Sequence, residues 1–304
     1  MERILIHEVG MRDGLQMEHE TVPTEKKIEW INNLAASGVD IIQIGSFVHP
    51  KYVPQMADTD ELFQHFNQPQ NRPKDVILSG LVLNEKGLER GLACGVDMFC
   101  MGVSASETHS QKNTRMGINE ALQRILGMAR TAMAEGKMVQ ASVQSAFGCG
   151  FEGRVPAKNV LAIIDAYLEA GLKNISLADT AGHANPIQVS NLFKMIVAKD
   201  KTIECTCHFH NTFGMAIANC YAARRAGVVA YEASFAGLGG CPYTAVAGGN
   251  VCSEDLVHMF QELELRRDIK IDSLIAAAKK AAIFFNRELP GMVYRTGKIS
   301  DVGA

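Results

Sequence analysis

Short apolar segments alternate along the chain with segments of helical period. Eight of these apolar segments are bounded by Gly, Asp or Ser, which is typical of strands buried on both faces of a parallel sheet. They cover residues 4–10, 40–46, 77–82, 98–104, 139–146, 174–180, 203–210 and 231–239. Between them, apolar residues recur at three- and four-residue spacing, which predicts helices at residues 24–37, 119–135, 157–170 and 213–226.

A glycine follows several of the predicted helices. Such a glycine commonly ends a helix before a short loop into the next strand. Eight strand–helix units in this order predict a (β/α)8 TIM barrel. A doubly wound open sheet is the alternative, but no GxGxxG motif opens a helix after the first strand. The glycines at predicted helix ends are Gly38, Gly95, Gly136, Gly171 and Gly227.

The barrel accounts for nearly the whole chain. No low-complexity linker divides it, so we expect residues 1–304 to form a single catalytic domain. Residues 271–287 have helical period and predict one additional C-terminal helix. We expect the tail after Pro290 to be a loop, so that residues 271–304 form a C-terminal helix and tail.

Composition and charge exclude several classes of protein. Hydrophobic residues make up 47% and charged residues 21%, a globular balance, and the net charge of −3 argues against nucleic acid as a partner. No apolar run reaches the roughly 18 residues that span a membrane. The first residues lack the order of a signal peptide. Without an export signal, the eight cysteines indicate reduced thiols, so we expect a cytoplasmic protein.

Polar residues at the carboxyl ends of the predicted strands are the candidates for chemistry, because active sites of such barrels lie there. His208 and His210 stand two residues apart on one strand and point to the same face, where they can chelate one divalent cation. Two hydrogen-bonded histidines on a polar strand end are the alternative. Asp13, after the first strand, offers the anionic oxygen that hard cations favour, and Asn250 offers an amide oxygen.

Other polar residues near these strand ends have two interpretations each. Arg12 can stabilise a developing oxyanion in a closed site, or it can form a salt bridge with Glu8. Cys241 lies in a Gly-Gly-Cys-Pro-Tyr loop and can transfer protons, whereas we expect the other cysteines to be small buried hydrophobes. Asp179 ends the sixth predicted strand, and Glu254 fits the acidic first turn of a helix.

Several motifs resemble those of a known family. EVGMRDGLQ at residues 8–16 resembles the opening motif of hydroxymethylglutaryl-CoA lyases, which belong to a group of metal-dependent lyases and synthases built on a (β/α)8 barrel. GLGGCPY at residues 237–243 is similar to a loop of the lyase branch that the condensing synthases usually lack. The resemblance runs from residue 4 to residue 294 and includes SFVHPK at 46–51, VPQMAD at 53–58, SLADT at 176–180 and HFH at 208–210.

The resemblance implies a role for each matching residue. Arg12 would stabilise the enolate of the departing thioester, and Cys241 would act in acid/base transfer. Asp179 and Glu254 would be supporting polar residues near the substrate. The divalent cation, Mg²⁺ or Mn²⁺, would be held by Asp13, His208, His210 and Asn250.

The resemblance also implies an activity and its partners. The enzyme would cleave a 3-hydroxyacyl-CoA between C2 and C3, with 3-hydroxy-3-methylglutaryl-CoA giving acetyl-CoA and acetoacetate. An acyl-CoA would be the small-molecule partner, and the family favours homodimers. The alternatives are a lyase for citramalyl-CoA or a longer branched glutaryl-CoA, a condensing synthase, and a weakly active metal-binding barrel.

Some residues depart from the family pattern near the expected substrate site. Gln43 stands where the lyases have glutamate, and His183 is not the usual residue of its loop. We expect Gln43, Ser46 and His183 to contact the substrate. A glutamine offers both donors and acceptors and carries no charge, which favours a substrate other than hydroxymethylglutaryl-CoA. A tolerated replacement without effect on selectivity is the alternative.

Overall fold

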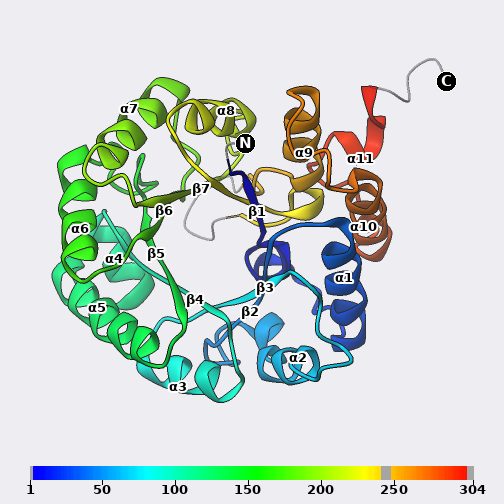
Figure 1. Cartoon of the computed structure of the whole chain (residues 1–304), viewed down its shortest axis with the longest axis horizontal. Helices are drawn as coiled ribbons and strands as arrows, with labels where there is room; N and C mark the ends of the chain where they lie inside the picture. Colours follow the sequence, from blue (N-terminus) through cyan, green and yellow to red (C-terminus); the bar gives the residue numbers. More distant parts are fainter. Residues whose placement is uncertain (1–2, 241–247, 300–304) are drawn as a thin grey trace.

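Eight parallel strands close into a barrel in the computed structural model, which describes residues 3–240 and 248–299. Strand β1 (Leu5–Glu8) pairs with β2 (Ile41–Ser46) on one side and with β8 (Ala230–Ala233) on the other (Figure 1). This closure confirms the predicted (β/α)8 barrel, because an open sheet would leave β1 and β8 unpaired. The other strands are β3 (Ile77–Leu81), β4 (Met98–Ser104), β5 (Met138–Gln144), β6 (Asn174–Asp179) and β7 (Glu204–Phe209).

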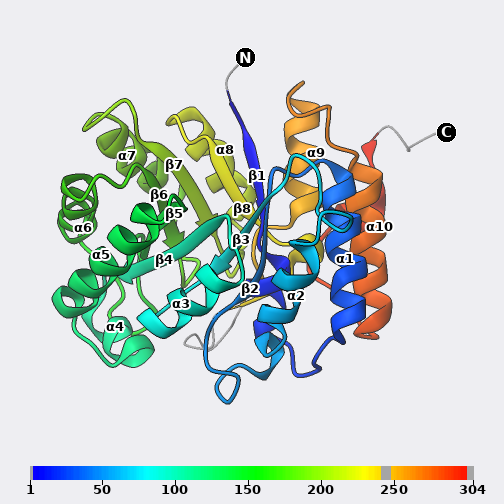
Figure 2. The same cartoon turned by 60° about the horizontal axis from the view of Figure 1, so that its bottom comes forward.

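Helices surround the barrel on its outside (Figures 1 and 2). The predicted helix at residues 24–37 matches α1 (Thr24–Ser37), and the bounds of the other predicted helices agree to within three residues. The last predicted strand, 231–239, is longer than the observed β8, which ends at Ala233. Gly38 ends α1 with φ of 95°, and the other four predicted end glycines also have positive φ. The remaining helices are α2 (Thr59–Phe66), α3 (Glu85–Ala93), α4 (Glu107–Thr114), α5 (Ile118–Ala134), α6 (Ala157–Glu169), α7 (Pro186–Val197), α8 (Ala216–Arg225) and α9 (Ser253–Glu262).

The C-terminal region adds more regular structure than we predicted. The additional helix is α10 (Ile271–Phe284), and it packs against α1, where Phe284 lies edge-on to Trp30 with ring centroids 5.6 Å apart. The tail after Pro290 was expected to be a loop, but it contains a short helix, α11 (Val293–Thr296). Asp255 explains the difference, because its carboxylate accepts the N–H groups of Met292 at 3.0 Å and Val293 at 2.7 Å. This cap comes from a residue far away in the sequence.

The main apolar core lies between the strands and the helices. A separate, small apolar cluster consists of Ile41 on β2 and Met98 and Cys100 on β4. Of these residues, Cys100 also lines the pocket described below. No helix within residues 3–240 and 248–299 is long and apolar enough to cross a membrane.

Candidate active site

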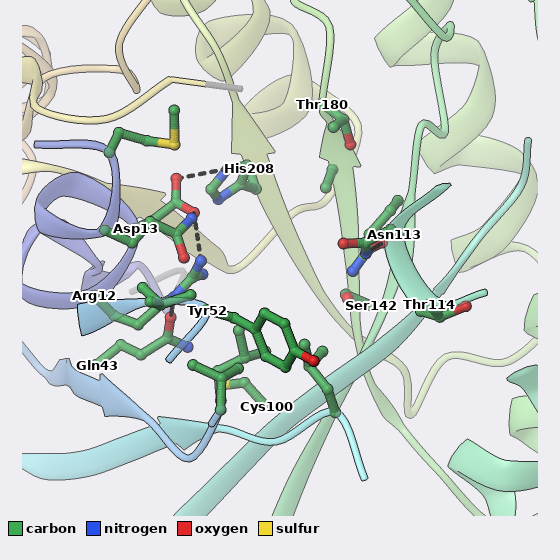
Figure 3. Close-up of a pocket in the computed structure, with 18 of the residues that line it drawn as sticks. Arg12, Asp13, Gln43, Tyr52, Cys100, Asn113, Thr114, Ser142, Thr180 and His208 are labelled. Carbon is green, nitrogen blue, oxygen red and sulfur yellow. Dashed lines mark hydrogen bonds and ion pairs between the residues drawn. The ribbon is translucent and has the colours of Figure 1, made fainter. Parts of the chain in front are cut away.

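A pocket of about 860 Å³ opens at the carboxyl ends of the strands. Residues at the end of every strand, or in the loop that follows it, contribute to its lining. One group of charged and imidazole side chains comes from the ends of β1 and β7, and Figure 3 shows Arg12, Asp13 and His208 of this group. The members of this group are Arg12, Asp13, His208 and His210.

Three side chains meet closely enough to bind one cation. Asp13 Oδ2 lies 3.8 Å from His208 Nε2 and 3.6 Å from His210 Nε2. The two Nε2 atoms are 3.0 Å apart, and all three residues are buried. The two histidines therefore face the same side of their strand, as their spacing predicted.

A tight turn after β1 brings Arg12 and Asp13 to this position. Residues Gly10–Gly14 form a single π-helical turn, in which the N–H of Asp13 bonds to the carbonyl of Val9 at 2.7 Å. Gly10 allows the close approach, because a Cβ there would lie 2.5 Å from the ring of Phe235. Glu8 secures the turn by accepting the N–H of Gly10 at 2.7 Å.

Arg12 is held by two side chains at the pocket wall. Its Nε donates to Gln43 Oε1, and its Nη1 forms an ion pair with Asp13 Oδ1 (Figure 3). The expected alternative partner, Glu8, instead accepts the N–H groups of Gly10 and Phe235 and the hydroxyl of Ser253. Nε and Nη1 of the guanidinium are thus bonded to protein side chains, while Arg12 still lines the pocket.

The charges of this cluster set its protonation. Burial raises the pKa of Asp13, but the charge of Arg12 and the two imidazoles outweigh burial, so the pKa lies well below the usual value. Burial lowers the pKa of His210, and Asp13 only partly offsets this. Asp13 is therefore anionic and His210 is a neutral imidazole, which are the protonation states that cation binding requires.

Glu232, on β8, is a member of the site that sequence reasoning missed. Its Oε2 lies 2.7 Å from His208 Nδ1. Burial opposes protonation of His208, but this hydrogen bond and the charge of Glu232 outweigh it and raise the pKa of His208. In the neutral form of His208, a proton on Nδ1 leaves the Nε2 lone pair facing Asp13 and His210. The sequence signal that could have identified Glu232 is its position as an acidic residue within an otherwise apolar predicted strand.

The donor set fits a divalent cation. Asn250 Nδ2 donates to Asp13 Oδ2 at 2.8 Å and to the carbonyl of Leu238 at 3.0 Å. Asn250 Oδ1 is buried and has no hydrogen-bond partner among the residues that the structure describes. A carboxylate oxygen and two imidazole nitrogens therefore converge here, with the amide group of Asn250 beside them, and this mixed set suits divalent metals.

Two other predicted site residues, Asp179 and Glu254, accept hydrogen bonds from backbone N–H groups and do not line the pocket. Asp179 accepts the N–H groups of His183 at 2.8 Å and Ala184 at 3.0 Å, and burial raises its pKa to about 7. Glu254 accepts the N–H of Ala236 at 3.1 Å, and burial raises its pKa to about 8. Asp179 thus holds the loop that follows Thr180, and Glu254 holds the turn that precedes Gly240, and both Thr180 and Gly240 line the pocket.

The remaining predicted substrate residues lie in different places. Gln43 lines the pocket beside Arg12. Ser46 is buried, and its N–H bonds to the hydroxyl of Thr59 at 3.2 Å. His183 is half-buried with its ring 5.8 Å from that of Phe213. Cys241 lies outside the described residues, although its neighbour Gly240 lines the pocket.

Comparisons with known proteins agree with this fold. Residues 3–280 match the family described as HMGL-like. A hydroxymethylglutaryl-CoA lyase of Bacillus subtilis is 36% identical over 95% of this chain and 95% of its own length. An (R)-citramalyl-CoA lyase of Chloroflexus aurantiacus is 34% identical over 98% of this chain and 96% of its own length.

Solved structures show the same relationship. An HMG-CoA lyase from Acinetobacter baumannii, in complex with coenzyme A and 3-methylmalate, superposes with a TM-score of 0.93 at 35% identity, over 99% of this chain and 97% of that one. The HMG-CoA lyase structure from Bacillus subtilis has a TM-score of 0.92 at 36% identity, over 97% of this chain and 98% of that one. The chain belongs to the HMGL-like family.

Proposed function

We propose that the protein is a carbon–carbon lyase that cleaves a 3-hydroxyacyl-CoA between C2 and C3, with 3-hydroxy-3-methylglutaryl-CoA as substrate and acetyl-CoA and acetoacetate as products. The observation that carries this proposal is the meeting of Asp13, His208 and His210 beside Arg12 in one pocket. Relatives named hydroxymethylglutaryl-CoA lyase support it, as does the coenzyme A bound in a structural neighbour.

The reaction needs a proton acceptor for the 3-hydroxyl and a site for negative charge. When the hydroxyl loses its proton, a carbonyl forms at C3, and the electron pair of the C2–C3 bond moves onto the thioester as an enolate. A divalent cation, Mg²⁺ or Mn²⁺, held by Asp13, His208, His210 and Asn250, would acidify that hydroxyl and orient the substrate. The guanidinium of Arg12, fixed by Gln43 and Asp13, would stabilise the enolate.

The enolate must then take up a proton at C2. We assign this acid/base transfer to Cys241, since Gly240 immediately before it lines the pocket. Asp179 and Glu254 would support the site by holding the turns at residues 182–184 and 235–237. Gln43, Ser46 and His183 would contact or orient the substrate, and only Gln43 of these lines the pocket in the described residues.

A second candidate substrate is citramalyl-CoA. The contact between Gln43 and Arg12 favours it, because a neutral amide stands where the lyases have a carboxylate. A substrate whose carboxylate lies closer to the reacting carbon gains an amide donor and meets one anion fewer. A relative of nearly equal identity is named (R)-citramalyl-CoA lyase.

The proposal also covers the domain organisation, the location and the oligomeric state of the protein. Residues 1–304 would act as one catalytic domain that takes an acyl-CoA substrate, works in the cytoplasm and forms a homodimer. The test is acetyl-CoA release from hydroxymethylglutaryl-CoA and citramalyl-CoA, with and without a chelator, together with a metal count by mass spectrometry. Release that depends on a divalent cation supports the proposal. Release from neither thioester by metal-loaded protein contradicts it.

A further inference from the structure

One histidine inside the barrel has no part in the proposed reaction. His7 lies on β1, is fully buried and does not line the pocket. Pairing of β1 with β8 places His7 opposite Glu232, and pairing of β8 with β7 places Glu232 opposite His208. Side chains at paired positions of neighbouring strands lie on the same face of the sheet. His7, Glu232 and His208 therefore form one row across three strands inside the barrel.

Two neighbours hold the ring of His7. Its Nε2 lies 2.8 Å from the hydroxyl of Ser79 on β3. Its Nδ1 lies 3.7 Å from Glu232 Oε1 and has no hydrogen-bond partner among the residues that the structure describes. A movement of about half an ångström brings these two atoms within hydrogen-bond distance. The carboxylate is thus the group placed to satisfy this buried nitrogen.

The surroundings of His7 decide which nitrogen carries the proton. Burial lowers the pKa of His7 to about 4, and the charge of Glu232 only partly offsets this, so the ring is neutral and has a single N–H group. A lone pair on Nδ1 would face a carboxylate oxygen, which is unfavourable, whereas the hydroxyl of Ser79 can donate to Nε2. The N–H group therefore belongs on Nδ1, on the side of Glu232.

Glu232 needs such a donor, because its carboxylate is buried and its two oxygens are unequally held. Oε2 lies 2.7 Å from His208 Nδ1, whereas Oε1 accepts only the hydroxyl of Ser176 at 3.3 Å, among the hydrogen bonds of the described residues. A carboxylate is one planar group, so a donor that fixes Oε1 also fixes Oε2. The contact with His7 can therefore control how Glu232 orients the ring of His208.

We propose that His7 is a positioning residue for the cation site, an inference that rests on the metal ligands of the proposed function. Through Glu232, His7 holds the ring of His208 with its Nε2 towards the site, and so strengthens binding of the divalent cation. His7 itself touches neither the cation nor the substrate. A histidine that only filled space in the barrel would affect stability but would not act through Glu232.

Two amide variants separate these roles. The amide of asparagine takes the place of Nδ1, whereas the longer side chain of glutamine brings its amide to the place of Nε2. His7→Asn therefore keeps the donor towards Glu232 and gives up the contact with Ser79, and His7→Gln does the reverse. Isothermal titration of metal-free protein with Mn²⁺ should show nearly unchanged affinity for His7→Asn and about tenfold weaker binding for His7→Gln.

The matched control is Thr206→Val, which removes another buried hydrogen-bonding group inside the barrel. The hydroxyl of Thr206 accepts from Gln140 at 3.3 Å, and position 206 is paired with Ala230 rather than with Glu232. This variant should bind Mn²⁺ as the wild type does. Ser79→Ala releases the other side of the His7 ring and should also weaken binding, so the inference remains testable if His7→Gln does not fold.

A double variant tests whether His7 acts through Glu232. Glu232→Gln removes the carboxylate, so the addition of His7→Gln should weaken Mn²⁺ binding no further. If His7→Gln does not fold, Ser79→Ala takes its place in this double variant. Losses that add, equal affinity in the wild type and the tested variant, or a loss in His7→Asn as large as that in His7→Gln would overturn the inference.

Acetyl-CoA release from the two thioesters is measured on the same preparations. If the wild type binds Mn²⁺ but cleaves neither thioester, the lyase proposal fails, and the titrations still decide the role of His7. If the wild type cleaves a thioester and His7→Gln binds Mn²⁺ normally, the lyase proposal stands and the inference about His7 is wrong. If the wild type binds no Mn²⁺, the metal site and this inference fail together.

Discussion

His208 and Glu232 form a hydrogen-bonded pair across β7 and β8, with 2.7 Å between Nδ1 and Oε2. The two strands place His208 directly opposite Glu232 in register. The carboxylate fixes the imidazole ring so that its other nitrogen faces Asp13 and His210. We therefore expect metal affinity in this site to depend on a residue that is not itself one of the expected ligands.

Glu232→Gln should weaken divalent-cation binding by about 10- to 100-fold, the usual cost of losing such a partner. The amide keeps the shape but loses the charge that holds the proton on Nδ1. Isothermal titration of metal-free protein with Mn²⁺ measures the effect. Glu204→Gln, at the far end of β7 where the side chain pairs with Arg3, is the control and should bind normally. Equal affinity in both variants would show that Glu232 has no positioning role.

His208→Ala should lose its dependence on divalent cations and at least about a hundredfold in rate, because the loss of a metal's Lewis acidity removes several kcal/mol of stabilisation. A metal count by mass spectrometry and acetyl-CoA release with and without chelator provide the measurements. Full activity in this variant, or in chelated enzyme, contradicts the metal site.

Arg12→Lys should lower kcat by an amount that corresponds to about 3 kcal/mol in the activation barrier, as for other preorganised oxyanion donors. Lysine keeps the charge but cannot contact Gln43 and Asp13 together through a planar fork. The melting temperature should change little, which separates a catalytic role from a structural one. A variant that unfolds would assign Arg12 to the fold.

Gln43→Glu should shift the ratio of kcat/KM values for hydroxymethylglutaryl-CoA and citramalyl-CoA towards hydroxymethylglutaryl-CoA. A carboxylate in contact with Arg12 cancels part of the guanidinium charge, and it accepts hydrogen bonds only. The two substrates are assayed side by side, with Gln123→Glu on α5 as the control. If the ratio is unchanged, Gln43 is a tolerated replacement that does not set specificity.

Glu254→Gln should make stability less dependent on pH. The pKa of Glu254 rises from 4.5 to about 8 on folding, so the folded state binds a proton that the unfolded state has released. Wild-type stability therefore falls as pH rises between these two values and levels off above them. Urea unfolding at about pH 5 and about pH 9 should show a gain of a few kcal/mol at most for the variant at the higher pH. The exposed Glu262→Gln on the same helix should behave as wild type.

The sequence by itself determined the order and the bounds of most elements. The apolar segments and helical periods encode the strands and the five predicted helices locally, and the period of two along β7 placed His208 and His210 on one face. The polar residues at strand ends identified Asp13 and Asn250, because barrel closure brings all carboxyl ends to the same rim.

Only the tertiary structure decided which distant residues meet. The cap of α11 by Asp255, the contact of Arg12 with Gln43, and the pairing of His208 with Glu232 each join separate segments. The part of the pocket lining that lies on β5 and β6 likewise forms only once these strands take their places in the closed barrel. Periodicity reports the face on which a side chain lies, whereas its partner is set by strand register and by the turns that follow the strands, and these depend on how the whole chain packs.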